Sequence, residues 1–151
     1  MEENKVVTTE VSTAPAKKAF SKSYKDYNAA KDFDNALQRY KIIYPGLGDT
    51  GHHMMIRSIH SHVFREAQLK SQRQISALVI ANAGKEDPDF DSVVQDIQMR
   101  AFASIVASWS FDEECNVENV AEFLTANSFA YDDINILAGQ DSLFLTKKEN
   151  G

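Results

Sequence analysis

The stretch LQRYKIIY at residues 37–44 sets the class of fold that this chain adopts, because it is rich in residues that favour β-strands. Its aromatic and β-branched side chains at positions 40, 42 and 44 alternate with Arg39, Lys41 and Ile43. The next seven residues, PGLGDTG, contain three glycines and a proline, which is typical of a turn. A second extended run follows at residues 52–59. We therefore expect a β-hairpin here.

Beyond this hairpin the apolar spacing changes from every second residue to a helical period, which predicts amphipathic helices. Ser61 is a suitable N-cap for the first helix, and Gly84 is expected to end it. Asp89 or Asp91 is expected to start a second helix. The apolar stripe of that helix would continue through Val94, Ile97, Ala101, Ile105 and Trp109.

Two more helices are expected in the last third of the chain. Asn116 would cap a third helix, and a fourth would run from about Ala130 to Leu145. The predicted fold is therefore α+β and mainly α-helical, with a short N-terminal β-hairpin followed by about four helices.

The length of 151 residues favours one domain with flexible ends. Residues 1–30 are poor in large apolar side chains, so we expect a flexible N-terminal arm with a short helix near Tyr24–Phe33. Residues 31–146 are expected to form a single α+β domain. Residues 147–151 would be a polar C-terminal tail.

Charge is distributed unevenly along the chain, whose net charge is −6. Residues 86–141 hold thirteen carboxylates and one base, Arg100, whereas residues 36–85 carry a net charge of +5. This asymmetry favours a protein that docks to other proteins and argues against general nucleic-acid binding, which requires a cationic surface. No apolar run approaches the ~20 residues that a membrane-spanning helix needs. The single cysteine, Cys115, fits a reducing compartment such as the cytoplasm.

No set of reactive groups in the sequence indicates an enzyme. Four histidines lie within residues 52–62, but neighbours on a strand face opposite ways, so exposed or capping histidines are favoured over a zinc site. Cys115 follows Asp112, Glu113 and Glu114, whose charges should raise its thiol pKa and weaken it as a nucleophile. We therefore expect no catalytic residue, no metal and no cofactor.

Several segments together carry a resemblance to a known family. They are SIHSHVFREA at residues 58–67, VASWS at 106–110, NVENVAEFL at 116–124 and INILAGQDSLF at 134–144. In this order they resemble the tail assembly chaperones of long-tailed bacteriophages, which have a Ser-x-x-Phe/Tyr-Arg-x-Ala stretch, a tryptophan that ends a helix, and Ser/Thr-x-Glu-Asn before a short helix. The resemblance covers about residues 36–146.

The resemblance implies a non-enzymatic protein of the host cell cytoplasm that binds the phage tape-measure protein, and also tail-tube subunits, during tail assembly. A structural part of the virion, such as a head–tail connector or tail protein, is the alternative. A small acidic inhibitor is a third possibility, and association of several copies stays open. The candidate partner-binding residues are Phe64, Arg65, Trp109, Phe123 and Leu124, in or beside a groove around Trp109 and Leu124 with an acidic rim. Core packing is an equal alternative for Leu124.

Overall fold

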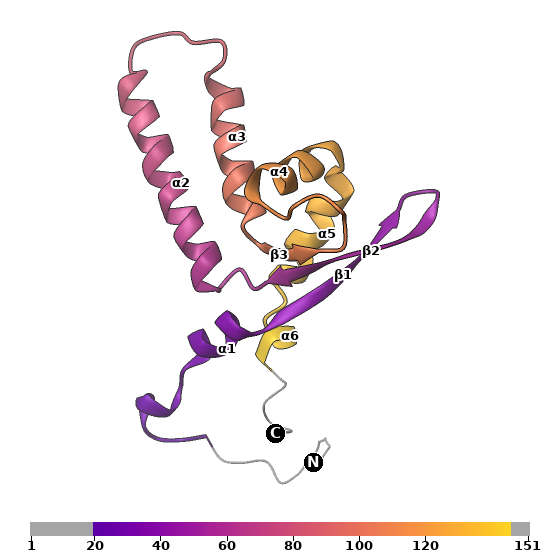
Figure 1. The fold of residues 1–151 in the computed structure, drawn as a ribbon. Coiled ribbons are helices and arrows are strands. Elements are labelled where there is room, and N and C mark those ends of the chain that lie inside the picture. Colours follow the sequence, from indigo (N-terminus) through magenta and orange to yellow (C-terminus); the bar gives the residue numbers. More distant parts are fainter. Residues whose placement is uncertain (1–19, 146–151) are drawn as a thin grey trace, which may run out of the picture.

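The computed structural model describes residues 20–145 of the chain. The predicted tail at residues 147–151 and most of the predicted arm, residues 1–19, lie outside the described residues. Figure 1 shows the described elements in chain order: η1 (Tyr24–Asp26), α1 (Ala29–Asn35), β1 (Leu37–Tyr44), β2 (Gly48–Arg57), α2 (His62–Ala81), α3 (Phe90–Ala103), β3 (Val106–Trp109), α4 (Val117–Ala126), α5 (Ser128–Ala138) and α6 (Asp141–Leu145).

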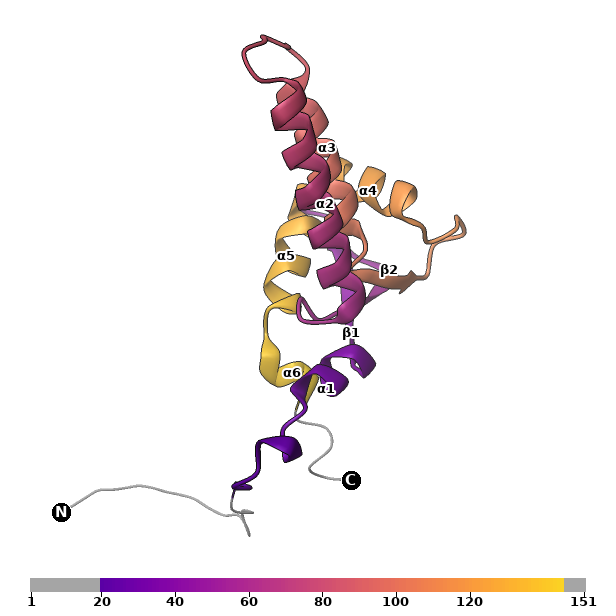
Figure 2. The same cartoon turned by 90° about the vertical axis from the view of Figure 1, so that its left-hand side faces the viewer.

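A three-stranded antiparallel sheet in the order β1-β2-β3 lies in the middle of the molecule, with helices on both sides (Figures 1 and 2). The expected β1–β2 hairpin forms, with Tyr40 opposite Met54. Its turn is shorter than predicted, because β2 already begins at Gly48. Gly46 and Gly48 have φ angles of 81° and 105°, in the left-handed region that glycine adopts without strain.

The predicted arrangement of an N-terminal hairpin followed by about four helices is wrong. Helix α3 ends at Ala103, and the segment that was expected to continue it to Trp109 forms the third strand, β3. The backbone N–H of Arg57 donates to the carbonyl of Ile105 at 2.8 Å, and Trp109 lies opposite Met54 in the sheet. The described residues also form six α-helices, because the last predicted helix is divided into α5 and α6 and α1 precedes the hairpin. Together, η1 and α1 overlap the short helix expected near Tyr24–Phe33.

Two predicted N-caps are confirmed. The side chain of Ser61 accepts a hydrogen bond from the backbone N–H of Phe64 at the start of α2. The side chain of Asn116 accepts one from the backbone N–H of Asn119 at 2.8 Å at the start of α4. Each bond satisfies a backbone donor that the first turn of a helix leaves free, so the start of each helix is fixed by a local signal.

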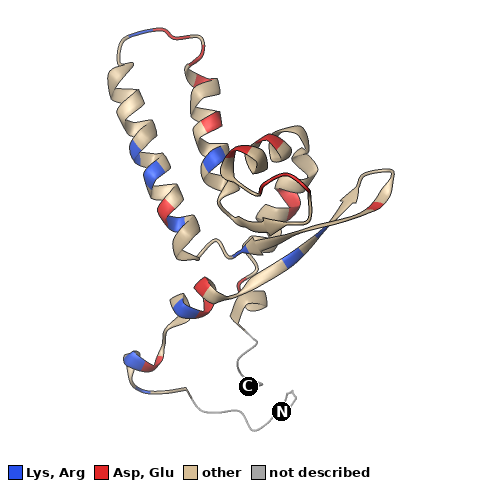
Figure 3. Cartoon of the chain, viewed as in Figure 1, with Lys and Arg blue, Asp and Glu red and all other residues tan. Residues whose placement is uncertain are grey.

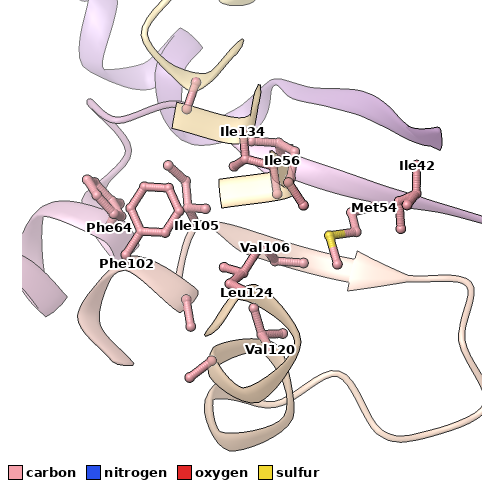
Figure 4. Packing of buried hydrophobic residues seen from close by; sticks show 14 residues of the cluster. Ile42, Met54, Ile56, Phe64, Phe102, Ile105, Val106, Val120, Leu124 and Ile134 are labelled. Atoms are coloured by element: carbon pink, nitrogen blue, oxygen red, sulfur yellow. The ribbon is translucent and has the colours of Figure 1, made fainter. Parts of the chain in front are cut away.

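The hydrophobic core lies between the sheet and the helices α3, α4 and α5 (Figure 4). Ile56 from β2, Leu124 from α4 and Ile134 from α5 are each at most 1% exposed. Phe64 and Phe102 meet edge to face at 6.1 Å between ring centres, where α2 joins the core. The other labelled members of this core are Ile42, Met54, Ile105, Val106 and Val120.

Helices α2 and α3 lie side by side and project away from the sheet (Figures 1 and 2). Of the 20 residues of α2, only Phe64 and Ser71 are buried. The distal ends of both helices are exposed, and Val79, Ile80 and Val93 there expose 52%, 76% and 42% of their surface. This helical hairpin therefore packs against the core mainly at the end nearest the sheet.

Candidate partner-binding groove

Three aromatic side chains gather where β3 ends and α4 passes over it. Trp109 closes β3, Phe111 lies in the loop that follows, and Phe123 lies on α4. The ring centres of Trp109 and Phe111 are 5.1 Å apart at an interplanar angle of 89°, and those of Phe111 and Phe123 are 5.4 Å apart. The ring of His52 lies against Phe111 at 4.3 Å. All three aromatic rings are half-buried, so each also presents surface outside the core.

Hydrogen bonds fix the loop that carries these rings. The indole N–H of Trp109 donates to the carbonyl of Glu113 at 2.8 Å, and the Asn119 amide donates to the carbonyl of Glu114 at 2.8 Å. The hydroxyl of Ser110 accepts from the backbone N–H of His53 at 2.9 Å. The loop is thus tied to β2, to α4 and to Trp109, and the aromatic surface is held in place before any partner arrives.

The three rings border a hollow of about 320 Å³, here named the aromatic pocket. Its other lining residues include Glu113 and Glu122. Within residues 20–145, neither of these two carboxylates forms a hydrogen bond or an ion pair. The faces of aromatic rings carry negative charge density, so rings and carboxylates here favour the same kind of guest, a cationic group with an apolar stem.

The surface around the aromatic pocket is strongly acidic. Figure 3 shows that acidic residues occur along α4 and in the loop before it, whereas the basic residues of α2 belong to the helix beyond α3. This arrangement would attract a basic partner over distances up to about the Debye length.

The structure brings two of the five candidate partner-binding residues together. Trp109 and Phe123 share the aromatic pocket, with 6.3 Å between their ring centres. Leu124 lies beside them but is 1% exposed and belongs to the core, as does Phe64 at 8%. Arg65 is exposed on α2, away from the pocket.

Sequence reasoning missed Phe111, Glu113 and Glu122 as parts of this pocket. Phe111 lies between the predicted second helix, which continues to Trp109, and the predicted cap of the third helix at Asn116, so the helical pattern assigns it to neither element. The alternation of Trp109 and Phe111 around Ser110 was a signal for an extended segment with both rings on one side.

The histidines and the cysteine lie in other surroundings. His60 Nε2 lies 3.2 Å from Asp141 Oδ1, and His52 Nδ1 is 2.9 Å from the Ser110 hydroxyl. In the described part of the chain, no three His, Cys, Asp or Glu side chains are grouped in a way that could hold a metal ion. Burial raises the pKa of the Cys115 thiol, and the charge of Arg57 opposes this only in part, so the thiolate is disfavoured at neutral pH.

Comparisons with known proteins found no match among family models, curated proteins or solved structures. None of the helices in residues 20–145 has the length and apolar character needed to cross a membrane.

Proposed function

We propose that this chain is a non-catalytic binding protein that acts as a phage tail assembly chaperone, and that a client segment docks in the aromatic pocket. The single observation that carries the binding role is an exposed aromatic pocket whose two carboxylates have no partner among the described residues. The identity of the client, the tape-measure protein together with tail-tube subunits, rests on the sequence resemblance described above.

The physical need for such a protein follows from the nature of the client. A tape-measure protein is a long, largely helical chain, and its apolar surface is exposed before the tail tube forms around it. Exposed apolar surface of this kind leads to aggregation. A small protein that accepts an amphipathic helix against aromatic side chains covers part of this surface, and its own negative charge keeps the complex soluble.

Co-expression with the tape-measure protein tests this proposal. Phe123→Asp places a charge on the apolar wall of the aromatic pocket, and we expect it to abolish co-purification of the tape-measure protein. Ile136→Asp is the matched control, because Ile136 is 63% exposed on α5 and lies outside the pocket lining. The control should retain the client.

A second variant covers the case in which Phe123→Asp does not fold. Glu122→Lys changes an exposed side chain at the pocket, so circular dichroism should show an unchanged fold while client recovery falls. Full recovery of the client with folded Phe123→Asp and with Glu122→Lys would show that the aromatic pocket is not the client site.

The projecting β1–β2 hairpin favours a structural virion protein as a second candidate. Leu47 at its tip is 83% exposed and Ile43 is 55% exposed, so the hairpin presents apolar side chains that a neighbouring subunit could cover (Figure 1). Mass spectrometry of purified particles separates the two functions. A structural subunit would be present in fixed copy number, whereas an assembly chaperone would be absent.

A further inference from the structure

Two more hollows lie next to the aromatic pocket. A hollow of about 510 Å³ between α3 and α4 shares Glu122 and Ala126 with the aromatic pocket. A hollow of about 470 Å³ between α2, α3 and the start of α4 shares Asp96 and Arg100 with the second one. The shared lining residues place the three hollows next to one another across α4 and α3, and this surface, which ends at α2, is here named the groove.

Small side chains keep this groove open. Ala67, Ala101 and Ala121 lie along it, one from each of the helices α2, α3 and α4. Ile97 and Val117 add apolar surface at the α2 end. Alanine at these positions leaves room for the side chains of a docked helix, which is how an amphipathic helix is usually received in a groove.

Arg100 lies in the middle of the groove and is already neutralised. Its Nε lies 3.0 Å from Asp96 Oδ2 and its Nη1 lies 3.2 Å from Glu118 Oε2. The charges of the groove that have no partner among the described residues are therefore at its ends. Lys70 is at the α2 end, and Glu122 and Glu113 are at the aromatic end.

The α2 end also holds an unsatisfied hydroxyl. Ser71 lines the hollow there and is 6% exposed, and its hydroxyl forms no hydrogen bond with any described residue. Buried polar groups without a partner are uncommon in native proteins. Lys70 and Gln74 line the same hollow, so an ammonium, a hydroxyl and an amide are available there to a group that accepts hydrogen bonds.

We propose that the groove binds one amphipathic helical segment of the client in a fixed direction, with its basic end in the aromatic pocket and a carboxylate at Lys70 and Ser71. This inference rests on the proposed function, because it takes the aromatic pocket as a client site. It adds the charge pattern of the segment and a second contact at α2. The oppositely charged ends of the groove would disfavour the reversed segment.

Two labelled peptides of about 18 residues, about 27 Å long as helices, provide the probe. Both have a leucine and alanine apolar face and two lysines in the last turn. One has two glutamates in the first turn, and in the other these glutamates are replaced by lysines. Fluorescence anisotropy with the full chain should show about tenfold tighter binding of the mixed-charge peptide, which corresponds to a single well-formed charged contact.

Lys70→Glu should reverse this preference, so that the all-lysine peptide binds more tightly. Lys85→Glu is the control, because Lys85 is exposed in the loop between α2 and α3, outside the groove, and this change should leave the preference as it is. An unchanged preference in Lys70→Glu would overturn the inference.

Phe123→Asp separates this inference from the proposed function. If it weakens both peptides while Lys70→Glu has no effect, the client is confined to the aromatic pocket and only the inference fails. If it weakens neither peptide, the proposed client site fails as well. A zero-length carboxyl–amine crosslinker gives a second measurement, because it should join Lys70 to a glutamate of the mixed-charge peptide and Glu122 to a lysine of the same peptide.

Discussion

Two isoleucines on α5 differ sharply in what surrounds them. Ile134 is 0% exposed in the core, whereas Ile136, two residues later, is 63% exposed. We expect Ile134→Ala to lower the free energy of unfolding by about 2–5 kcal/mol, because it removes buried methyl groups and leaves a cavity. Ile136→Ala should change it by less than about 0.5 kcal/mol. Urea denaturation of the two variants checks this. An equal loss of free energy of unfolding in both variants would contradict the described core.

Tyr40 makes the stability of the fold depend on pH in the alkaline range. Its hydroxyl donates to Asp133 Oδ2 at 2.9 Å, and burial, followed by this hydrogen bond, raises the pKa of Tyr40 well above its usual range. The folded chain therefore keeps the proton at a pH where the unfolded chain releases it. The contribution of Tyr40 is fully present below pH about 10 and is lost as the pH rises above that value.

The variant Tyr40→Phe should remove this contribution to the pH dependence. Its free energy of unfolding, measured by urea denaturation between pH 8 and pH 11.5, should decline less steeply than that of the wild type. Tyr24→Phe, at a side chain that is 80% exposed, should follow the wild-type curve. Parallel curves for Tyr40→Phe and the wild type would contradict the assigned role of the Tyr40–Asp133 contact.

At the scale of elements, the cap of α4 links stability to the aromatic pocket. Asn116→Ala removes the bond to the backbone N–H of Asn119, and we expect a loss of about 1 kcal/mol in the free energy of unfolding. Asn116→Asp keeps an acceptor there and should lose much less. Because α4 carries Phe123, Trp109 fluorescence should also change in Asn116→Ala more than in Asn116→Asp. Equal stability of the two variants would contradict the capping role.

The sequence predicted the starts of α2 and α4, because a cap is a local signal. Ser61 and Asn116 bond to backbone groups three residues away, so the sequence around each contains the whole interaction. Strand β3 could not be found in this way. Its four residues are held by hydrogen bonds to β2, about 50 residues earlier in the chain, and Ile105 and Trp109 happen to continue the helical spacing of α3.

The predicted fourth helix ran through the division between α5 and α6, although the polar stretch after Ala138 interrupts the apolar pattern there. The backbone N–H groups of Gly139 and Gln140 bond to carbonyls three residues back and close α5. Ala138 is completely buried, and the carbonyl of this residue accepts from the backbone N–H of Ile59. A contact distant in sequence thus coincides with the end of α5.

Across the whole molecule, backbone amide hydrogens should exchange faster in the parts that have few buried contacts. The distal α2–α3 hairpin has exposed apolar side chains and lies away from the core, whereas Met54 and Ile56 of β2 are completely buried. We expect backbone amides at residues 76–81 and 90–94 to exchange at least about tenfold faster than those at 54–56. Uniform protection across both regions, measured by mass spectrometry or NMR, would contradict this description.

Part of the candidate site could be predicted from the sequence. Trp109 and Phe123 were identified as partner-binding candidates, and the structure places them together in the aromatic pocket. Leu124 and Phe64 carry the same apolar chemistry, and only the three-dimensional packing shows that they face the core. The groove toward α2 joins residues as distant as Ala67 and Val117, which no periodicity within one helix reveals.

The contact between α6 and the first strand has a consequence for how the chain is made. The Gln38 amide donates to the carbonyl of Leu143 at 2.8 Å, and Phe144 beside it is 2% exposed. The two residues are 105 positions apart, so a nascent β1 lacks this cover until the ribosome has added the residues of α6. Chains released before residue 143 would lack this closure and would be the natural substrates of proteolysis.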